Sequence, residues 1–163
     1  MTGQTPPPPP PPPGPPGPPG GGSGGFDMTA AQGALKRASR LDQGLIVAGP
    51  LGFIWSLLPY YTLGPFSASA WHGFFGWAGA LLGLAASVLV LLAIVRVAVP
   101  LATPPVIAGL FLLSLLFIFI ALFVDAGSPI DLGRGVGYWL AFITALAAAG
   151  VACYGFAKDK QLI

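Results

Sequence analysis

The chain carries few charged residues, and they lie outside its long apolar stretches. Between residues 45 and 157 the charged residues are Arg96, Asp125, Asp131 and Arg134. Each lies at or beyond the end of an apolar stretch, where it avoids the cost of about 2.5–3.5 kcal/mol that a charge carries at the centre of a membrane helix. This placement predicts helices that cross a lipid bilayer.

Composition and length predict how many such helices there are. Hydrophobic residues make up 55% of the sequence and charged residues 7%, whereas about 25% of residues are charged in typical soluble domains. A helix needs roughly 17–25 apolar residues to cross the hydrocarbon layer, and four stretches meet this need: 44–61, 73–99, 105–124 and 136–157. Their interiors lack the polar face of a soluble amphipathic helix. We therefore predict an all-α membrane protein in which residues 44–157 form a four-transmembrane-helix bundle.

The basic residues predict the orientation of this bundle. With four crossings, six of them share one side: Lys36, Arg37, Arg40, Arg96, Lys158 and Lys160. Because cytoplasmic loops carry an excess of Lys and Arg, both termini are predicted to be cytoplasmic, including the short segment 158–163. Cleavage of a signal peptide after residues 68–70 would leave three spans and put Arg96 and Lys158 on opposite sides, so we favour an uncleaved first span. We therefore interpret the basic residues behind the net charge of +2 as signals that orient the spans, and not as a nucleic-acid-binding surface.

Residues 1–26 are dominated by proline and glycine. The run Pro6–Pro13 predicts an extended polyproline helix, and glycines then form a flexible joint. We expect a disordered cytoplasmic tail; the alternatives are a docking segment for a polyproline-binding protein, and a translation start at Met28 that leaves the tail out. Residues 27–43 are predicted to form a basic amphipathic juxtamembrane helix against anionic lipid headgroups, or else a plain basic flank that sets topology.

Small residues at intervals of three or four predict where the helices approach one another, because helices in a bilayer associate through close backbone packing. The predicted packing positions are Gly44, Ala48 and Gly52 in the first span, Gly76, Gly79, Ala80, Gly83 and Ser87 in the second, and Ala141, Ala145 and Ala148 in the fourth. Pro50 predicts a kink in the first span. The third span is bulky nearly all round, so we expect it to pack least tightly and to face lipid or a membrane-protein partner. The small-residue faces are expected to pack the protein's own bundle, and a homodimer interface is their alternative use.

Aromatic residues gather on the side opposite the basic residues. They predict an interfacial aromatic belt, and they surround a candidate outer-rim site: Tyr60, Tyr61, Trp71, His72, Asp125, Asp131 and Arg134. The chain has one His and one Cys (Cys153), and no ionisable group lies deep in a predicted span, so haem, metal, serine-nucleophile and aspartyl chemistry each lack a required partner. The glycine run at 133–137 follows no predicted strand and does not predict a phosphate loop. We expect no cofactor, no metal and no catalytic residue.

The order of these features resembles that of the small four-span integral membrane proteins of actinobacteria. The shared features are the Pro/Gly-rich tail, the Leu-Leu-Pro-Tyr-Tyr end of the first span at 57–61, and the Trp-rich start of the second at 71–77. The resemblance implies a bacterial plasma membrane and a four-span topology, and it implies no activity. We expect a non-enzymatic scaffold or adaptor, with a role in cell-envelope assembly. The alternatives are an accessory subunit of a transporter or channel, and a protein that binds lipid or quinone at the outer rim.

Overall fold

The chain is mostly helical in the computed structural model, which describes residues 28–124 and 133–161. The helices are α1 (Met28–Arg37), α2 (Arg40–Leu57), α3 (Phe74–Ile94), α4 (Pro104–Ile120) and α5 (Val136–Asp159). A 3-10 turn, η1 (Ala70–His72), and the strands β1 (Tyr61–Leu63), β2 (Phe66–Ala68) and β3 (Gly133–Arg134) lie between them. The prediction that the chain is mostly helical is confirmed. The prediction that it contains only helices is wrong, because the three strands form a small sheet. The predicted tail, residues 1–26, lies outside the described residues.

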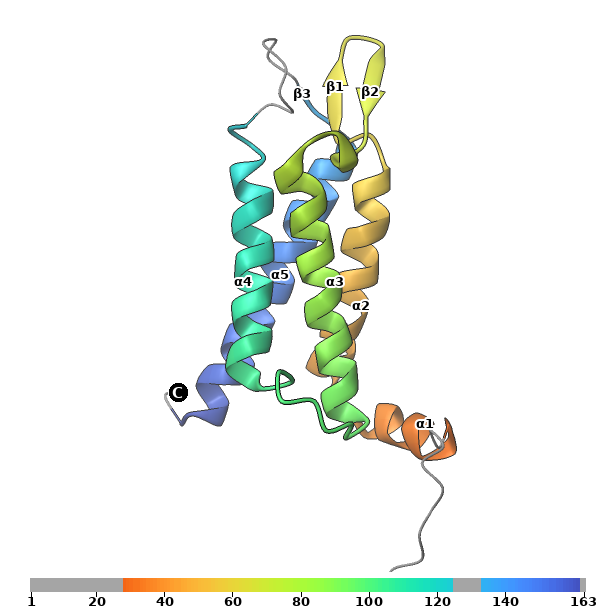
Figure 1. Cartoon of the computed structure of the whole chain (residues 1–163), viewed down its shortest axis with the longest axis vertical. Coiled ribbons are helices and arrows are strands. Elements are labelled where there is room, and N and C mark those ends of the chain that lie inside the picture. Colours follow the sequence, from red (N-terminus) through yellow and green to blue (C-terminus); the bar gives the residue numbers. More distant parts are fainter. Residues whose placement is uncertain (1–27, 125–132, 162–163) are drawn as a thin grey trace, which may run out of the picture.

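The four long helices pack side by side in a ring (Figure 1). Each packs against its neighbour in sequence, and α2 closes the ring against α5. Helix α1 lies across one end, at a large angle to the other four. We call this the basic end, because six basic residues lie on the segments that meet there: Lys36, Arg37, Arg40, Arg96, Lys158 and Lys160. The opposite end carries the strands and is called the sheet end.

Two of the helices, α3 with 21 residues and α5 with 24, are long and apolar enough to cross a membrane. Helix α4 is apolar but has 17 residues, and α2 opens with a polar turn that contains Arg40 and Asp42. At 1.5 Å per residue, α2 and α4 are about 26–27 Å long, a little short of the ~30 Å hydrocarbon layer. Length and composition therefore support two spans, where the sequence predicts four.

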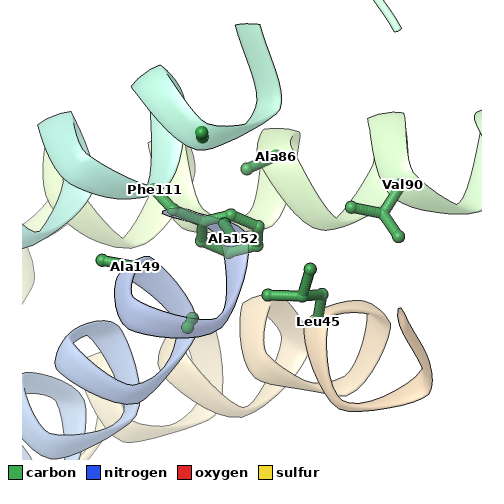
Figure 2. Close-up of a cluster of buried hydrophobic side chains, with 8 residues drawn as sticks. Leu45, Ala86, Val90, Phe111, Ala149 and Ala152 are labelled. Atoms are coloured by element: carbon green, nitrogen blue, oxygen red, sulfur yellow. The ribbon is translucent and has the colours of Figure 1, made fainter. Parts of the chain in front are cut away.

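Small side chains fill the interior of the ring. In its basic half, alanines of α3, α4 and α5 surround three larger residues, Leu45, Val90 and Phe111. Figure 2 shows these larger side chains among Ala86, Ala149 and Ala152. Large apolar side chains lie instead on the outside of all four helices: Val47, Ile54 and Leu57 on α2; Leu81 and Val88 on α3; Leu112, Leu116 and Phe119 on α4; Ile143 and Leu146 on α5.

The sheet end is closed by a β-hairpin and one further strand. The order is β2-β1-β3, and both pairings are antiparallel, with Tyr61 opposite Ala68 on one side and Arg134 on the other. Gly64 has a φ of 56° and supplies the positive φ that a two-residue hairpin loop requires at its first position. Strand β3 thereby joins the start of α5 to the end of α2.

The predicted juxtamembrane helix of residues 27–43 is divided in the structure. Helix α1 ends at Arg37, and Ser39 caps α2 by accepting a hydrogen bond from Asp42 N at 3.1 Å. The side-chain amide of Gln43 donates to the carbonyls of Leu35 (3.3 Å) and Ala38 (3.2 Å). The amide thus adds to the hydrogen bonds on carbonyls at and just after the end of α1, and it ties α1 to α2.

Candidate functional site

Three tyrosines from separate segments meet inside the sheet end. Tyr60 follows α2, Tyr61 opens β1 and Tyr138 belongs to the first turn of α5, and their exposed fractions are 1%, 2% and 0%. The ring centroid of Tyr60 lies 5.1 Å from that of Tyr61 and 5.2 Å from that of Tyr138, and the rings of both pairs meet edge to face. The structure thus brings together two predicted rim residues, Tyr60 and Tyr61, and it adds Tyr138, which is not among the predicted rim residues.

Polar groups are enclosed in this tyrosine cluster. The hydroxyls of Tyr60 and Tyr138 are buried and have no hydrogen-bond partner among the described residues. Burial raises the pKa of the Tyr60 phenol well above its ordinary value; Tyr61 and Tyr138 add to this rise, and Arg134 opposes it.

Arg134 links the tyrosine cluster to α4. Its guanidinium Nη2 donates to the carbonyl of Leu122 at 2.7 Å, in the turn that follows α4, and its guanidinium carbon lies 5.3 Å from the ring centroid of Tyr61. A basic side chain on the last carbonyls of a helix satisfies them and opposes the negative end of the helix dipole. In this geometry Arg134 acts as a cap for α4.

Two further predicted rim residues, Trp71 and His72, lie apart from the tyrosine cluster. Trp71 stacks on Trp77 at a centroid distance of 6.3 Å and donates its indole N–H to Ser56 Oγ at 3.3 Å. His72 is exposed in η1. Asp125 and Asp131 lie outside the described residues. In residues 28–124 and 133–161, no group of three or more His, Cys, Asp and Glu side chains is placed to hold a metal ion.

The glycine run at 133–137 has a structural use at this end. Gly135 N and Gly137 N donate to the carbonyls of Tyr60 (2.9 Å) and Pro59 (3.0 Å), so the start of α5 is hydrogen-bonded to the end of α2. A Cβ on Gly137 would lie 2.8 Å from the carbonyl oxygen of Trp55. These glycines are required because two backbones approach closely.

The predicted packing positions are buried in α3 and α5 but not in α2. Gly76, Gly79, Ala80, Gly83 and Ser87 are buried, as are Ala141, Ala145 and Ala148. In α2 the prediction is wrong for Gly44 and Gly52, where an added Cβ would meet nothing within 4 Å, and Ala48 is only partly buried. The buried glycine of α2 is Gly49.

Gly49 lies where α2 approaches α3 closely, because an added Cβ there would lie 2.7 Å from Gly83 O. Ser87 Oγ accepts a hydrogen bond from Gly49 N at 2.9 Å and donates one to Leu45 O at 2.5 Å. An α-helix normally pairs these two backbone groups with each other, so the hydroxyl of α3 enters the hydrogen-bond ladder of α2. Pro50 follows at once and has no N–H to donate to Ile46 O. The predicted kink site is thus held by a neighbouring helix.

Helix α4 does not pack less tightly than the others, so that expectation is wrong. It packs against α3 as extensively as α2 does. Ser114 Oγ donates to Gly79 O at 2.7 Å, and a Cβ on Gly79 would lie 2.8 Å from Ile118 Cγ1. Close approach here combines the small Gly79 and Gly83 of α3 with Ser114 of α4, and the bulky Ile118 of α4 occupies the space that Gly79 leaves.

Two of the larger hollows lie at the basic end. One, of about 590 Å³, lies between α1 and the end of α3 and is lined by residues that include Arg37 and Arg96. The other, of about 490 Å³, lies between the ends of α2, α3, α4 and α5, with Asp42 and Lys158 among its lining residues. Both fall within the ~300–1,000 Å³ typical of ligand sites.

No family model, curated protein or solved structure matches the chain. The resemblance to four-span actinobacterial proteins therefore stays a prediction.

Proposed function

We propose that this protein is a four-span, non-enzymatic component of a bacterial plasma membrane that acts as a scaffold or adaptor. The proposal rests mainly on where small and large side chains lie, because their arrangement is the opposite of that in a soluble protein. Alanine, glycine and serine dominate the interior, whereas leucine, isoleucine, valine and phenylalanine are exposed around all four long helices. Soluble proteins bury such large side chains, and an exposed apolar surface of this extent marks contact with a membrane or a partner.

Hydrogen bonds between the helices support their placement in a lipid bilayer. Ser87 joins α3 to α2 and Ser114 joins α4 to α3, while Trp55 Nε1 of α2 donates to Thr144 Oγ1 of α5 at 3.2 Å. Interfaces built from small residues with a few polar links are typical of membrane helices, which cannot rely on the hydrophobic effect to associate with one another.

The shorter helices α2 and α4 are included as spans for a geometric reason. They complete the same ring as α3 and α5 and have similar directions (Figure 1). Helical hydrogen bonds also continue past α4, from Ala121 N to Phe117 O (3.0 Å) and from Val124 N to Ile120 O (3.1 Å). A bilayer that surrounds two sides of the ring would surround the other two, since their outer faces are equally apolar.

The basic end is assigned to the cytoplasm. Six basic residues lie there, and cytoplasmic ends of membrane proteins are enriched in Lys and Arg. Helix α1 lies across this end with Lys36 and Arg37 exposed, as an interfacial helix does in the headgroup layer. Both termini would then lie on the cytoplasmic side, where the proline-rich tail can recruit a partner with an aromatic groove.

A pull-down in mild detergent tests the adaptor proposal. Full-length protein and a variant without residues 1–26 are purified in parallel, and the proteins that co-purify with each are identified. A partner that depends on the tail supports the adaptor role. A transporter or channel that co-purifies equally with both forms would instead establish the accessory-subunit alternative.

A further inference from the structure

We propose that the cleft between α1 and the end of α3 binds the phosphate headgroup of an anionic glycerophospholipid from the cytoplasmic leaflet. The inference rests on the proposed function, because it requires that α3 cross the bilayer. The cleft, of about 590 Å³, is large enough for a headgroup with its glycerol. Its place follows from the fold, since α1 lies across the end of the bundle beside the last turn of α3 (Figure 1).

The two walls of the cleft suit an anionic amphiphile. Small alanines of α1 leave the space open, and Ile94, Val95 and Val97 supply an aliphatic wall for glycerol and the first methylenes of an acyl chain. Arg37 and Arg96, one from each wall, supply the charge. A guanidinium presents paired N–H donors that match phosphate oxygens, and it is less strongly hydrated than an ammonium group.

Arg96 holds a backbone conformation that a side chain disfavours. Its φ is 58°, in the left-handed region that glycine adopts at no steric cost. Within residues 28–124 and 133–161, the Arg96 side chain has no ion pair or side-chain hydrogen bond. Glycine would adopt this φ at lower steric cost than arginine. We therefore attribute the arginine at position 96 to its guanidinium group and not to the backbone conformation.

Side-chain hydrogen bonds order the opposite wall of the cleft. Arg37 Nε donates to Gly33 O at 3.1 Å, which holds the guanidinium along α1. The Gln43 amide bonds to Leu35 and Ala38 then hold α1 against α2. A site held in this way binds a ligand with less loss of conformational entropy.

The position of the cleft relative to the bilayer favours a lipid headgroup over a free phosphate ion. Helix α3 ends at Ile94, and Arg96 follows two residues later, at the level where a span gives way to the headgroup layer. Basic pockets on the cytoplasmic side of membrane helices recognise anionic headgroups. We therefore assign the cleft to a lipid.

The test measures lipid binding to the full-length protein, delipidated and held in neutral detergent micelles. Radiolabelled phosphatidylglycerol is the probe, and phosphatidylcholine with the same acyl chains and inorganic phosphate are the competitors. Arg96→Gly and Arg37→Gln should each weaken phosphatidylglycerol binding about fivefold. Lys160→Gln, which removes a basic residue at the same end but outside the cleft, should leave binding unchanged. Arg96→Gly should also keep its thermal stability, because it relieves the backbone.

Three results would overturn the inference: equal affinity for the two lipids, equal weakening by Lys160→Gln, or displacement of the lipid by inorganic phosphate. If Arg96→Gly fails to fold, Arg37→Gln decides the question alone. A different result would contradict the proposed function itself: wild-type protein would be recovered from cells in the soluble fraction and not in the membranes.

Discussion

At the scale of single residues, glycines decide how closely the helices approach, and their sequence spacing does not identify the ones that matter. The ladder Gly44, Ala48 and Gly52 has the spacing of a packing face, yet the buried glycine is Gly49. Small residues lie on more than one face of α2, so the spacing alone selects the wrong face. The partner hydroxyl, Ser87, becomes visible only when α3 is placed beside it.

Gly49 and Gly52 offer a matched pair of substitutions. In Gly49→Ala the new methyl group would collide with Ser87 Oγ and lie 2.7 Å from Gly83 O, whereas in Gly52→Ala it meets nothing within 4 Å. We expect Gly49→Ala to lower the free energy of unfolding in detergent by about 1–3 kcal/mol. Gly52→Ala should leave it unchanged or raise it by up to about 1 kcal/mol, because alanine favours a helix. Equal effects would contradict the observed α2–α3 contact.

Tyr60 tests whether the tyrosine cluster is a structural cap or a ligand site. Its buried hydroxyl has no partner among the described residues, and such a group costs about 1–3 kcal/mol. We expect Tyr60→Phe to raise the free energy of unfolding, and Tyr154→Phe, at an exposed position, to change nothing. A stability loss in Tyr60→Phe would mean that the hydroxyl binds a water or a ligand, in favour of the outer-rim alternative.

At the scale of elements, the sequence predicts helix positions better than it predicts what joins them. Predicted spans and observed helices overlap throughout, because apolar runs and basic flanks have a direct cause in the bilayer. The hairpin and β3 were missed, since three strands of two or three residues leave no period to detect. Gly64-Pro65 marks a turn without revealing a hairpin, and the roles of Gly135 and Gly137 become apparent only when Pro59 and Tyr60 lie against them.

The junction of α2 and α5 depends on Gly137. Alanine there would bring a methyl group within 2.8 Å of Trp55 O and 3.0 Å of Pro59 O, so the two backbones must separate. We expect Gly137→Ala to lower the thermal midpoint of unfolding and Gly150→Ala, in the same helix but with open space around it, to leave it unchanged or raise it. If the two variants behave alike, the start of α5 does not pack on the end of α2 as described.

At the scale of the whole molecule, the candidate site was only partly predictable. Sequence placed Tyr60, Tyr61 and Arg134 at one rim, but it grouped them with Trp71 and His72, which lie elsewhere on that end. Aromatic composition locates an interface and does not say which rings meet. The cleft at Arg96 is not predictable for a related reason, since the sequence predicts α1 and the start of α2 as one helix over residues 27–43.

The number of crossings is the central claim, and labelling of single cysteines tests it most directly. In a Cys153→Ser background, a cysteine is placed at Ser67 in the hairpin, at Ala98 after α3, or at Gln161 after α5, all exposed positions. Intact cells are treated with a membrane-impermeant maleimide. Four spans predict that Ser67→Cys is labelled at once, and that Ala98→Cys and Gln161→Cys are labelled only after permeabilisation. Labelling of Ser67→Cys and Gln161→Cys from the same side, as two spans formed by α3 and α5 alone would give, would contradict the account.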